Sequence, residues 1–508
     1  MRLIACLLLS LVAFGSHAQS EPDTLYSRVL QPADMQADFA YLRRLLEETH
    51  PGLYRYTSKA VMQAKLDSVA ATLTKPLPFR DFYRTVETLI ADVRCAHTYA
   101  VPVKDFEDRF KKLWKTFPFF MLPIQNRSYV LFNGTTDETI KPGFELLSIN
   151  GQSMETIRQK LFRYHWADGY IQSSKEAVLK GGVFDLFYYW FIEQPNSFHA
   201  SFRTLTGDTV QVSVPAQSFN VSLKAYKKNR VNKQMVAWYL GNQPKRPWRI
   251  KFLPDSPSTA YLRINEFGGK GANSNESAVG LLQKFMNKSM AQIQKKGVQN
   301  LIVDIRSNPG GWDSQGIDLF TYLMKSDSAV AYYTRQHSIT DNTESEFMKF
   351  SDLSAADREN VKNELIPESD GTFTLKQGDS GRQPRRYAPK PNRFRGRVYF
   401  LMNGQSGSTA SEFLAIAHAN RTGIFVGEES GGAYEGGNGS SFIHLDLPHS
   451  KINVGTPLVY YNNAVGEVNP KGRGTLPDYN VPITVDDILR HTDSQLNFVK
   501  ELIRSQPK

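Results

Sequence analysis

The chain has 508 residues, which is more than one hydrophobic core usually organises, so we expect two or three domains. Hydrophobic residues make up 41% and charged residues 22% of the chain, which excludes a disordered or fibrous protein. The formal net charge is +11, and the clearest basic run, 382–397, is interrupted by prolines. Such a run indicates a solvated linker, and without a nucleic-acid-binding motif we expect no nucleic-acid partner.

Residues 1–18 have the pattern of an N-terminal export signal. Arg2 precedes an apolar run from Leu3 to Phe14, and small residues follow up to Ala18. This order predicts cleavage after Ala18. The alternative is an uncleaved membrane anchor, but the run is shorter than the ~20 residues that a spanning helix needs. We therefore expect a periplasmic or secreted protein with no stable membrane span after signal cleavage.

The chain contains two cysteines, Cys6 and Cys95. Signal cleavage would leave Cys95 alone, so the mature chain would have no internal disulfide. A small buried hydrophobe is the more usual role for Cys95 than a nucleophile. The ten histidines are scattered, and no cluster has the spacing of metal ligands. We therefore expect no metal and no other cofactor.

Residues 20–100 are predicted to form an N-terminal helical region. Apolar residues recur at helical spacing in 39–50 and again in 82–93. Pro51 and Gly52 end the first of these helices.

Residues 101–215 are predicted to form a β-rich middle domain. One strand-like run is 128–134, and another precedes Asn150 and Gly151, which are typical of a tight turn. A short strand, this turn and then a helix-like segment resemble part of a PDZ domain. PDZ domains bind extended peptides by adding them as a strand at a sheet edge. A plain β-rich spacer explains the pattern equally well.

Strands and helices alternate over residues 245–508. This βαβ alternation favours an α/β core with parallel strands. The polar, turn-rich stretch 351–397 is predicted to be an insertion in this core. The expected strands are 259–267, 300–307 and 398–403, and the expected helices are 277–296 and 410–421.

The strand-to-helix turn at 403–412 contains the candidate nucleophile. A hydroxyl there lies at the exposed end of a strand and at a helix N-terminus, whose free N–H groups stabilise negative charge. These conditions suit a serine nucleophile beside an oxyanion hole. The alternative is that Ser408 or Thr409 is only a helix N-cap, with Glu412 completing a capping box.

The segment 301–312 is the second candidate. Its buried strand turns sharply at two adjacent glycines, Gly310 and Gly311, whose backbone N–H groups can approach a ligand closely. These groups could donate to an oxyanion. The residues expected to support the turn are Asp304, Arg306 and Asn308.

The third candidate is His97, at the end of a predicted helix. Its ring has a pKa suited to a general base near neutral pH. A single histidine is more often structural than catalytic, so this residue alone does not decide the function.

Together these segments resemble the tail-specific (C-terminal-processing) serine peptidases, a family that includes the tricorn protease core. The resemblance implies a crotonase-like ββα core, serine endopeptidase or carboxy-terminal processing activity, and peptide or protein substrates, with binding through the substrate C-terminus as one mode. The five motifs occur in the family's order: Asp92 to Thr98, Asp304 to Gly311, Ser408 to Glu412, Val426 to Gly432, and Pro477-Asp478.

The chain departs from the Ser/Lys members of this family at Ala433, where they have a lysine. The tricorn branch instead uses a histidine oriented by a glutamate. By resemblance, Ser408 would be the nucleophile, His97 the base and Glu467 the orienting residue. The oxyanion donors would be the backbone amides near Gly310, Gly311 and Thr409.

The register at the nucleophile leaves two candidates. Counting forward from Asn403-Gly404 gives Ser408, and counting back from Ser411-Glu412 gives Thr409. We favour Ser408 because it is the less hindered alcohol. The family also includes non-catalytic members, so a peptide- or lipophile-binding protein on the same scaffold is the alternative function.

Overall fold

The computed structural model describes residues 24–241, 243–338, 344–369, 372–375, 384–468 and 470–506. The predicted export signal, 1–18, lies outside these ranges. Within them, no helix is long and apolar enough to cross a membrane.

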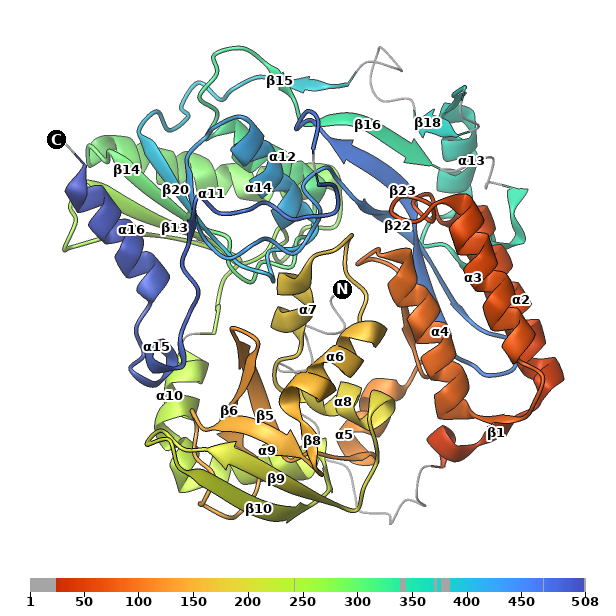
Figure 1. The fold of residues 1–508 in the computed structure, drawn as a ribbon. Coiled ribbons are helices and arrows are strands. Elements are labelled where there is room, and N and C mark those ends of the chain that lie inside the picture. Colours follow the sequence, from red (N-terminus) through yellow and green to blue (C-terminus); the bar gives the residue numbers. More distant parts are fainter. Residues whose placement is uncertain are drawn as a thin grey trace.

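The α/β core is a six-stranded sheet in the order β12-β13-β14-β20-β21-β24, as Figure 1 shows in part. Only β12 runs antiparallel to its neighbour. All of β14 and nearly all of β20 is buried, which is typical of parallel strands covered on both faces. The parallel α/β core predicted from the sequence is confirmed. The strands are β12 (Trp248–Phe252), β13 (Thr259–Ile264), β14 (Asn300–Asp304), β20 (Arg397–Met402), β21 (Ile424–Gly427) and β24 (Tyr479–Asn480).

Helices cover both faces of this sheet. Val303 and Phe400 pack in a cluster with side chains of α11 (Asn275–Lys295), α12 (Asp313–Thr321) and α14 (Thr409–Ala419). The alternate residues Ile302 and Leu401 pack against α16 (Ser494–Ser505) instead. This alternation follows from the two-residue period of a strand.

The register of the two central strands fixes where the candidate site forms. β14 and β20 are parallel neighbours, and Asp304 pairs with Leu401 near the ends of both strands. The chain segments that follow them, 305–312 and 403–409, therefore leave from the same edge of the sheet. In open α/β sheets this edge is where ligands bind.

The middle region is built on an antiparallel sheet in the order β10-β9-β7-β6-β5. The predicted turn at Asn150 and Gly151 is confirmed: both residues have positive φ and join β7 to β8. The strands are β5 (Phe119–Ile124), β6 (Arg127–Asn133), β7 (Glu145–Ile149), β8 (Gln152–Ser153), β9 (Ser197–Arg203) and β10 (Thr209–Pro215). The helices are α6 (Met154–Tyr164), α7 (Gln172–Val178), α8 (Gly182–Phe191), α9 (Phe219–Lys228) and α10 (Lys233–Gly241).

The edge of this sheet at β5 is partly covered by the chain itself. Gly181 forms a bridge with Met121 of β5, and the Gly181 amide donates to the Met121 carbonyl at 2.7 Å. Every residue of the following helix, α8, is buried.

The N-terminal region is helical, as predicted, and packs on a third sheet. Apolar side chains of α2 (Pro32–Thr49) and α4 (Phe79–Val93) share a core with Leu445 and Val454. Two further helices are α3 (Lys59–Thr72) and α5 (Phe106–Lys112). The sheet has the order β17-β18-β16-β23-β22. Its strands are β16 (Tyr333–Ser338), β17 (Leu365–Pro367), β18 (Phe373–Leu375), β22 (Asn438–Asp446) and β23 (Asn453–Asn463).

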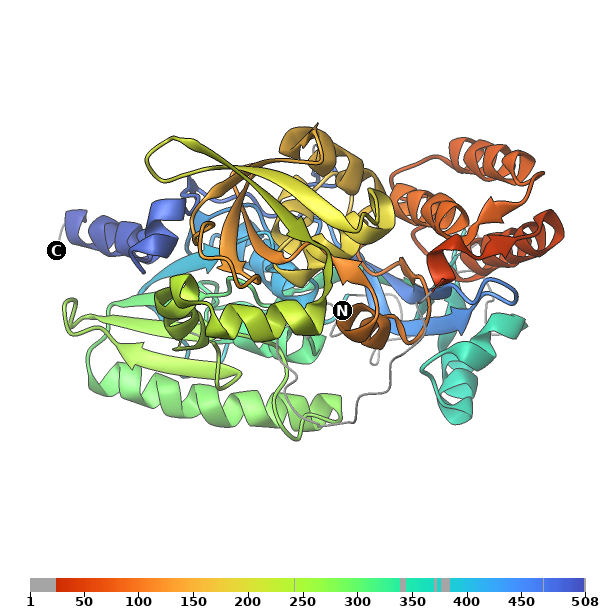
Figure 2. The ribbon, with the colours of Figure 1, turned by 90° about the horizontal axis from the view of Figure 1, so that it is seen from below.

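The strand β3 (Tyr99–Val101) ties the N-terminal region to the C-terminal half. It starts directly after His97-Thr98 and pairs antiparallel with β23. The N-terminal region therefore folds back onto the sheet that contains β23. Figure 2 shows the middle sheet and α11 on opposite sides of the molecule, with α2 to α4 at one end and α16 at the other.

Candidate active site

Ser408 is held in a strained backbone conformation between β20 and α14. Its φ is 51° and its ψ is −134°, and its side chain makes no capping hydrogen bond to α14. A non-glycine residue with positive φ costs about 1–3 kcal/mol, which the surrounding structure must supply. A sharp strand-to-helix turn of this kind exposes the hydroxyl of a nucleophilic serine.

The hydroxyls of the neighbouring residues Thr409 and Ser411 both make hydrogen bonds within the fold. The Thr409 hydroxyl donates to the Gly311 carbonyl and to Asp313 Oδ1, both at 2.9 Å. The Ser411 hydroxyl donates to the Ser408 carbonyl at 2.7 Å. Ser408 is half-buried, and among the described residues its own hydroxyl has no hydrogen-bond partner. Of the three hydroxyls, that of Ser408 is the one available for chemistry.

The glycine pair lies directly against Ser408. A Cβ on Gly310 would lie 2.6 Å from the Cβ of Ser408, and a Cβ on Gly311 would lie 1.7 Å from the Phe267 carbonyl oxygen. Both positions also have positive φ, 96° and 139°. Only glycine allows the backbone to approach this closely.

Asn308 joins the two turns. Its Oδ1 accepts from the Gly310 amide at 2.9 Å, and its carbonyl accepts from the Gly407 amide at 3.0 Å. The Gly310 amide is therefore engaged, whereas the amides of Gly311 and Thr409 have no acceptor within the described part of the chain.

Asp304 and Arg306 form a buried ion-pair network behind the turn. Arg306 Nη2 lies 2.6 Å from Asp304 and 2.7 Å from Asp493, and Arg263 also pairs with Asp304. Burial alone would raise the pKa of Asp304, but the two guanidinium groups reverse this effect and hold the pKa below its usual value. In this arrangement the two residues stabilise the turn and do not contact Ser408.

His97 is buried, and its ring lies beside Phe442 of β22. Among the residues that the structure describes, its Nδ1 has no hydrogen-bond partner, and its ring centroid lies 5.9 Å from that of Phe442. Burial lowers the pKa of His97 to about 4, so the ring is neutral at neutral pH. Glu467 is exposed in the stretch after β23, and no hydrogen bond between it and His97 occurs in the described structure.

His50 and Asp168 complete this region, and the sequence patterns did not single them out. His50 Nδ1 accepts from the Gly52 amide at 3.0 Å, so its Nε2 carries the proton and donates to Thr98 Oγ1 at 2.7 Å. Asp168, between α6 and α7, accepts from the Ala96 amide at 2.8 Å. A carboxylate within the aromatic stretch 164–170 was the signal that could have identified Asp168.

Cys95 and Glu412 are both buried, and burial raises the pKa of each. The pKa of Cys95 rises to about 11, which keeps its thiol protonated. The pKa of Glu412 rises to about 8, and Tyr333 donates to its carboxyl. The described residues include no group of three or more histidine, cysteine, aspartate or glutamate side chains that could hold a metal ion.

Ser408 combines a strained backbone with a hydroxyl that has no partner among the described residues, and it lies beside a glycine pair at the carboxyl edge of a parallel sheet. These features are typical of serine hydrolases. Comparison with known families indicates which kind of serine hydrolase the chain resembles. Residues 258–481, a little under half of the chain, match the profile of "Peptidase family S41", so this segment is similar to the tail-specific peptidases and supports a serine-type peptidase. The matched segment includes Ser408 and Glu467, and His97 lies outside it.

Solved structures support the fold beyond that segment. Mature CPAF in complex with lactacystin is 14% identical, with a TM-score of 0.59 over 93% of this chain and 97% of that chain. A second crystal structure of mature CPAF gives a TM-score of 0.59 at 15% identity, over 93% of this chain and 96% of that chain. No curated protein sequence matches the chain.

Proposed function

We propose that the chain is an exported endopeptidase or carboxy-terminal processing peptidase with a Ser-His-Glu site. The main support for this proposal is Ser408, which has a strained backbone and a hydroxyl without a hydrogen-bond partner in the described structure. The hydroxyls of Thr409 and Ser411 both donate hydrogen bonds within the fold. Ser408 Oγ attacks the peptide carbonyl, and His97 takes its proton and later delivers it to the leaving amine.

The oxyanion of the tetrahedral intermediate is held by backbone amides. Gly311 and Thr409 are the proposed donors, because the Gly310 amide already donates to Asn308. Gly310 instead gives the space that allows its loop to contact Ser408. Such donors are worth ~10²–10³-fold in rate when they are preorganised.

Glu467 is the proposed partner of His97, and the two must approach each other in the working enzyme. Within the described part of the chain, His97 Nδ1 has no hydrogen bond that must break first, and Glu467 is exposed. A neutral buried imidazole is able to accept the Ser408 proton, and an approaching carboxylate would stabilise the imidazolium that forms.

A fluorophosphonate probe separates this function from the non-catalytic alternative. Such a probe reacts with the activated serine of a hydrolase and forms a bond to its oxygen. We expect labelling of the folded wild-type protein, together with cleavage of an unstructured peptide or protein. Folded protein that is neither labelled nor able to cleave would support a peptide- or lipophile-binding function instead.

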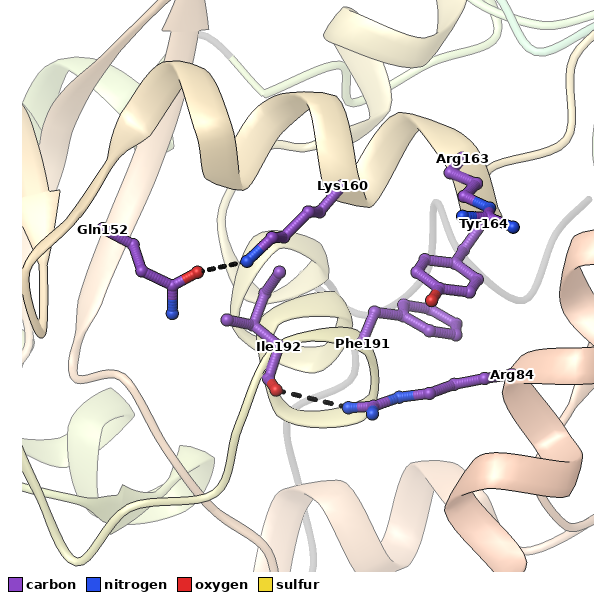
Figure 3. A pocket seen from close by; sticks show the side chains of 7 residues that line it. All are labelled: Arg84, Gln152, Lys160, Arg163, Tyr164, Phe191 and Ile192. Carbon is purple, nitrogen blue, oxygen red and sulfur yellow. Dashed lines mark hydrogen bonds between the residues drawn. The ribbon is translucent and has the colours of Figure 1, made fainter.

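We further propose that the middle region captures the substrate C-terminus at a basic hollow of about 360 Å³ between α4, α6 and α8 (Figure 3). Strand addition at β5, as in a PDZ domain, is disfavoured because Gly181 already bridges that edge. The hollow is lined by Arg84, Gln152, Lys160, Arg163, Tyr164, Phe191 and Ile192.

The charges of this hollow favour a carboxylate. Arg84 donates to the Trp190 carbonyl, and Lys160 donates to the neutral side chain of Gln152 at 2.6 Å. Arg163 is exposed and has no partner among the described residues. No carboxylate is among the residues that line the hollow. Arg84 pairs with Asp81 on α4 at 3.5 Å, so the positive charge that an entering anion meets comes mainly from Lys160 and Arg163.

Matched peptides test this capture. A peptide with a free C-terminal carboxylate should have a lower KM than the same peptide with a C-terminal amide. The double variant Lys160→Ala, Arg163→Ala should abolish the difference, whereas Lys227→Ala, Lys228→Ala on α9 should preserve it. Equal KM values for both peptides on the wild type would contradict the proposal.

A further inference from the structure

Asp168, Gly169 and Tyr170 lie between α6 and α7 and contact the segment that precedes His97. Asp168 Oδ1 accepts from the Ala96 amide at 2.8 Å, and the Gly169 amide donates to the Arg94 carbonyl at 3.0 Å. The Arg94 guanidinium lies 4.1 Å from the centre of the Tyr170 ring. These contacts fix the chain directly before the candidate base.

Two of these residues, Gly169 and Tyr170, also contact the segment that follows Glu467. The Tyr170 amide donates to the Gly472 carbonyl at 2.7 Å. The backbones approach so closely that a Cβ on Gly169 would lie 2.3 Å from Gly472 Cα. Gly472 is also held from its other side, because its amide donates to Glu435 at 2.8 Å.

Asp168 also lies against the nucleophile turn. A Cβ on Gly432 would be 3.5 Å from Asp168 Oδ2 and 2.1 Å from the Ser411 hydroxyl, which donates to the Ser408 carbonyl. The helix that follows, α7, reaches the same turn, since Gln405 Nε2 donates to the Ala177 carbonyl at 2.9 Å.

We propose that Asp168 is a positioning residue of the peptidase site, supplied by the middle region. Together with Gly169 and Tyr170 it holds the segments that carry His97 and Glu467 against the turn of Ser408. This inference rests on the proposed Ser-His-Glu function and adds to it a residue from outside the segment that matches the peptidase family. The carboxylate acts through the Ala96 amide and does not contact the substrate.

The hydrogen bond from the Ala96 amide to Asp168 predicts that the asparagine and alanine variants of Asp168 differ in activity. Asp168→Asn keeps a side-chain oxygen that can accept from the Ala96 amide, whereas Asp168→Ala leaves this amide unpartnered. Displacements of about 1 Å in a catalytic site cost ~10²-fold in rate. We therefore expect Asp168→Ala to lower kcat by ~10–100-fold with KM nearly unchanged, and Asp168→Asn to recover most of that loss.

The control is Asp185→Asn in α8. Asp185 is also buried, and its Oδ1 has no hydrogen-bond partner among the described residues, but the contacts of α8 described above are with β5, α4 and α6 and not with the Ser408 turn. Its kcat should stay within about two-fold of the wild type. A generic effect of losing a buried carboxylate would lower kcat in Asp185→Asn and Asp168→Asn alike, which would contradict the proposal.

The test measures kcat, KM and amide hydrogen exchange in the full chain. Faster exchange in both 94–98 and 470–474 is expected for Asp168→Ala, and this readout does not depend on activity. Wild-type exchange in both segments overturns the inference even if the wild type proves inactive, an outcome that would separately contradict the proposed function. If Asp168→Ala does not fold, Arg94→Ala replaces it with the same expected pattern, and a wild-type kcat in that variant overturns the inference.

Discussion

At the scale of single residues, Ser408 is the one of three neighbouring hydroxyl residues that we expect to attack the substrate. Ser408→Ala should abolish peptide hydrolysis and probe labelling while leaving the melting temperature close to that of the wild type. Thr409→Val should instead keep activity but lose stability, since it removes the donor to Asp313 and Gly311, at ~1–3 kcal/mol for an unsatisfied buried partner. An active Ser408→Ala variant beside an inactive Thr409→Val variant would move the nucleophile to Thr409.

The assignment of His97 as the base predicts how kcat/KM falls at acidic pH. Burial lowers the pKa of His97 to about 4 in the free protein, and kcat/KM reports the free enzyme. Activity should therefore fall as pH decreases, with a midpoint below the ordinary histidine value of ~6.5. His97→Ala should lose ~10²–10⁴-fold in kcat/KM. An unchanged acid limb in a still-active His97→Ala variant would assign the base to another group.

Burial raises the pKa of Glu412, whereas it lowers that of His97, and Glu412 therefore makes the protein less stable as pH rises. Its folded-state pKa is raised to about 8 by burial, so the folded protein binds a proton there that the unfolded chain releases near pH 4.5. The stabilising contribution is complete below that value and is lost as pH rises toward 8. Glu412→Gln, which stays neutral, should gain stability relative to the wild type by ~1–4 kcal/mol between pH 5 and pH 8. Chemical unfolding at both pH values measures this, and a pH-independent difference would contradict it.

At the element scale, the parallel pair β14 and β20 brings the glycine pair against Ser408. Gly310→Ala places a methyl group 2.6 Å from the Ser408 Cβ at a φ of 96°, so one of the two turns must move. We expect kcat to fall by ~10²-fold or more. The matched control is Gly207→Ala, which has the same φ of 96° but no atom within 4 Å of the added Cβ. Equal loss of kcat in both variants would mean that backbone strain, and not contact with Ser408, determines the effect.

At the scale of the whole molecule, the sequence predicted the elements whose pattern is local. The apolar periodicity of 39–50 and 82–93, the Asn150-Gly151 turn and the βαβ alternation all correspond to observed elements. Periodicity cannot show which distant strands pair, so the third sheet was not predicted, although it joins β3 beside His97 to β23. The buried contacts of Asp168 likewise depend on segments far apart in the chain, and no local spacing encodes them.

If Ser408, His97 and Glu467 act together, the structure of the protein phosphonylated by a peptidyl phosphonate should show all three around the adduct. We expect the phosphorus to be bonded to Ser408 Oγ and its oxygen to lie within about 3 Å of the Gly311 and Thr409 amides. We also expect the His97 ring to have turned toward Ser408, with Glu467 at its Nδ1. A phosphonyl group on another residue, or His97 still against Phe442 while a different side chain contacts the adduct, would contradict this prediction.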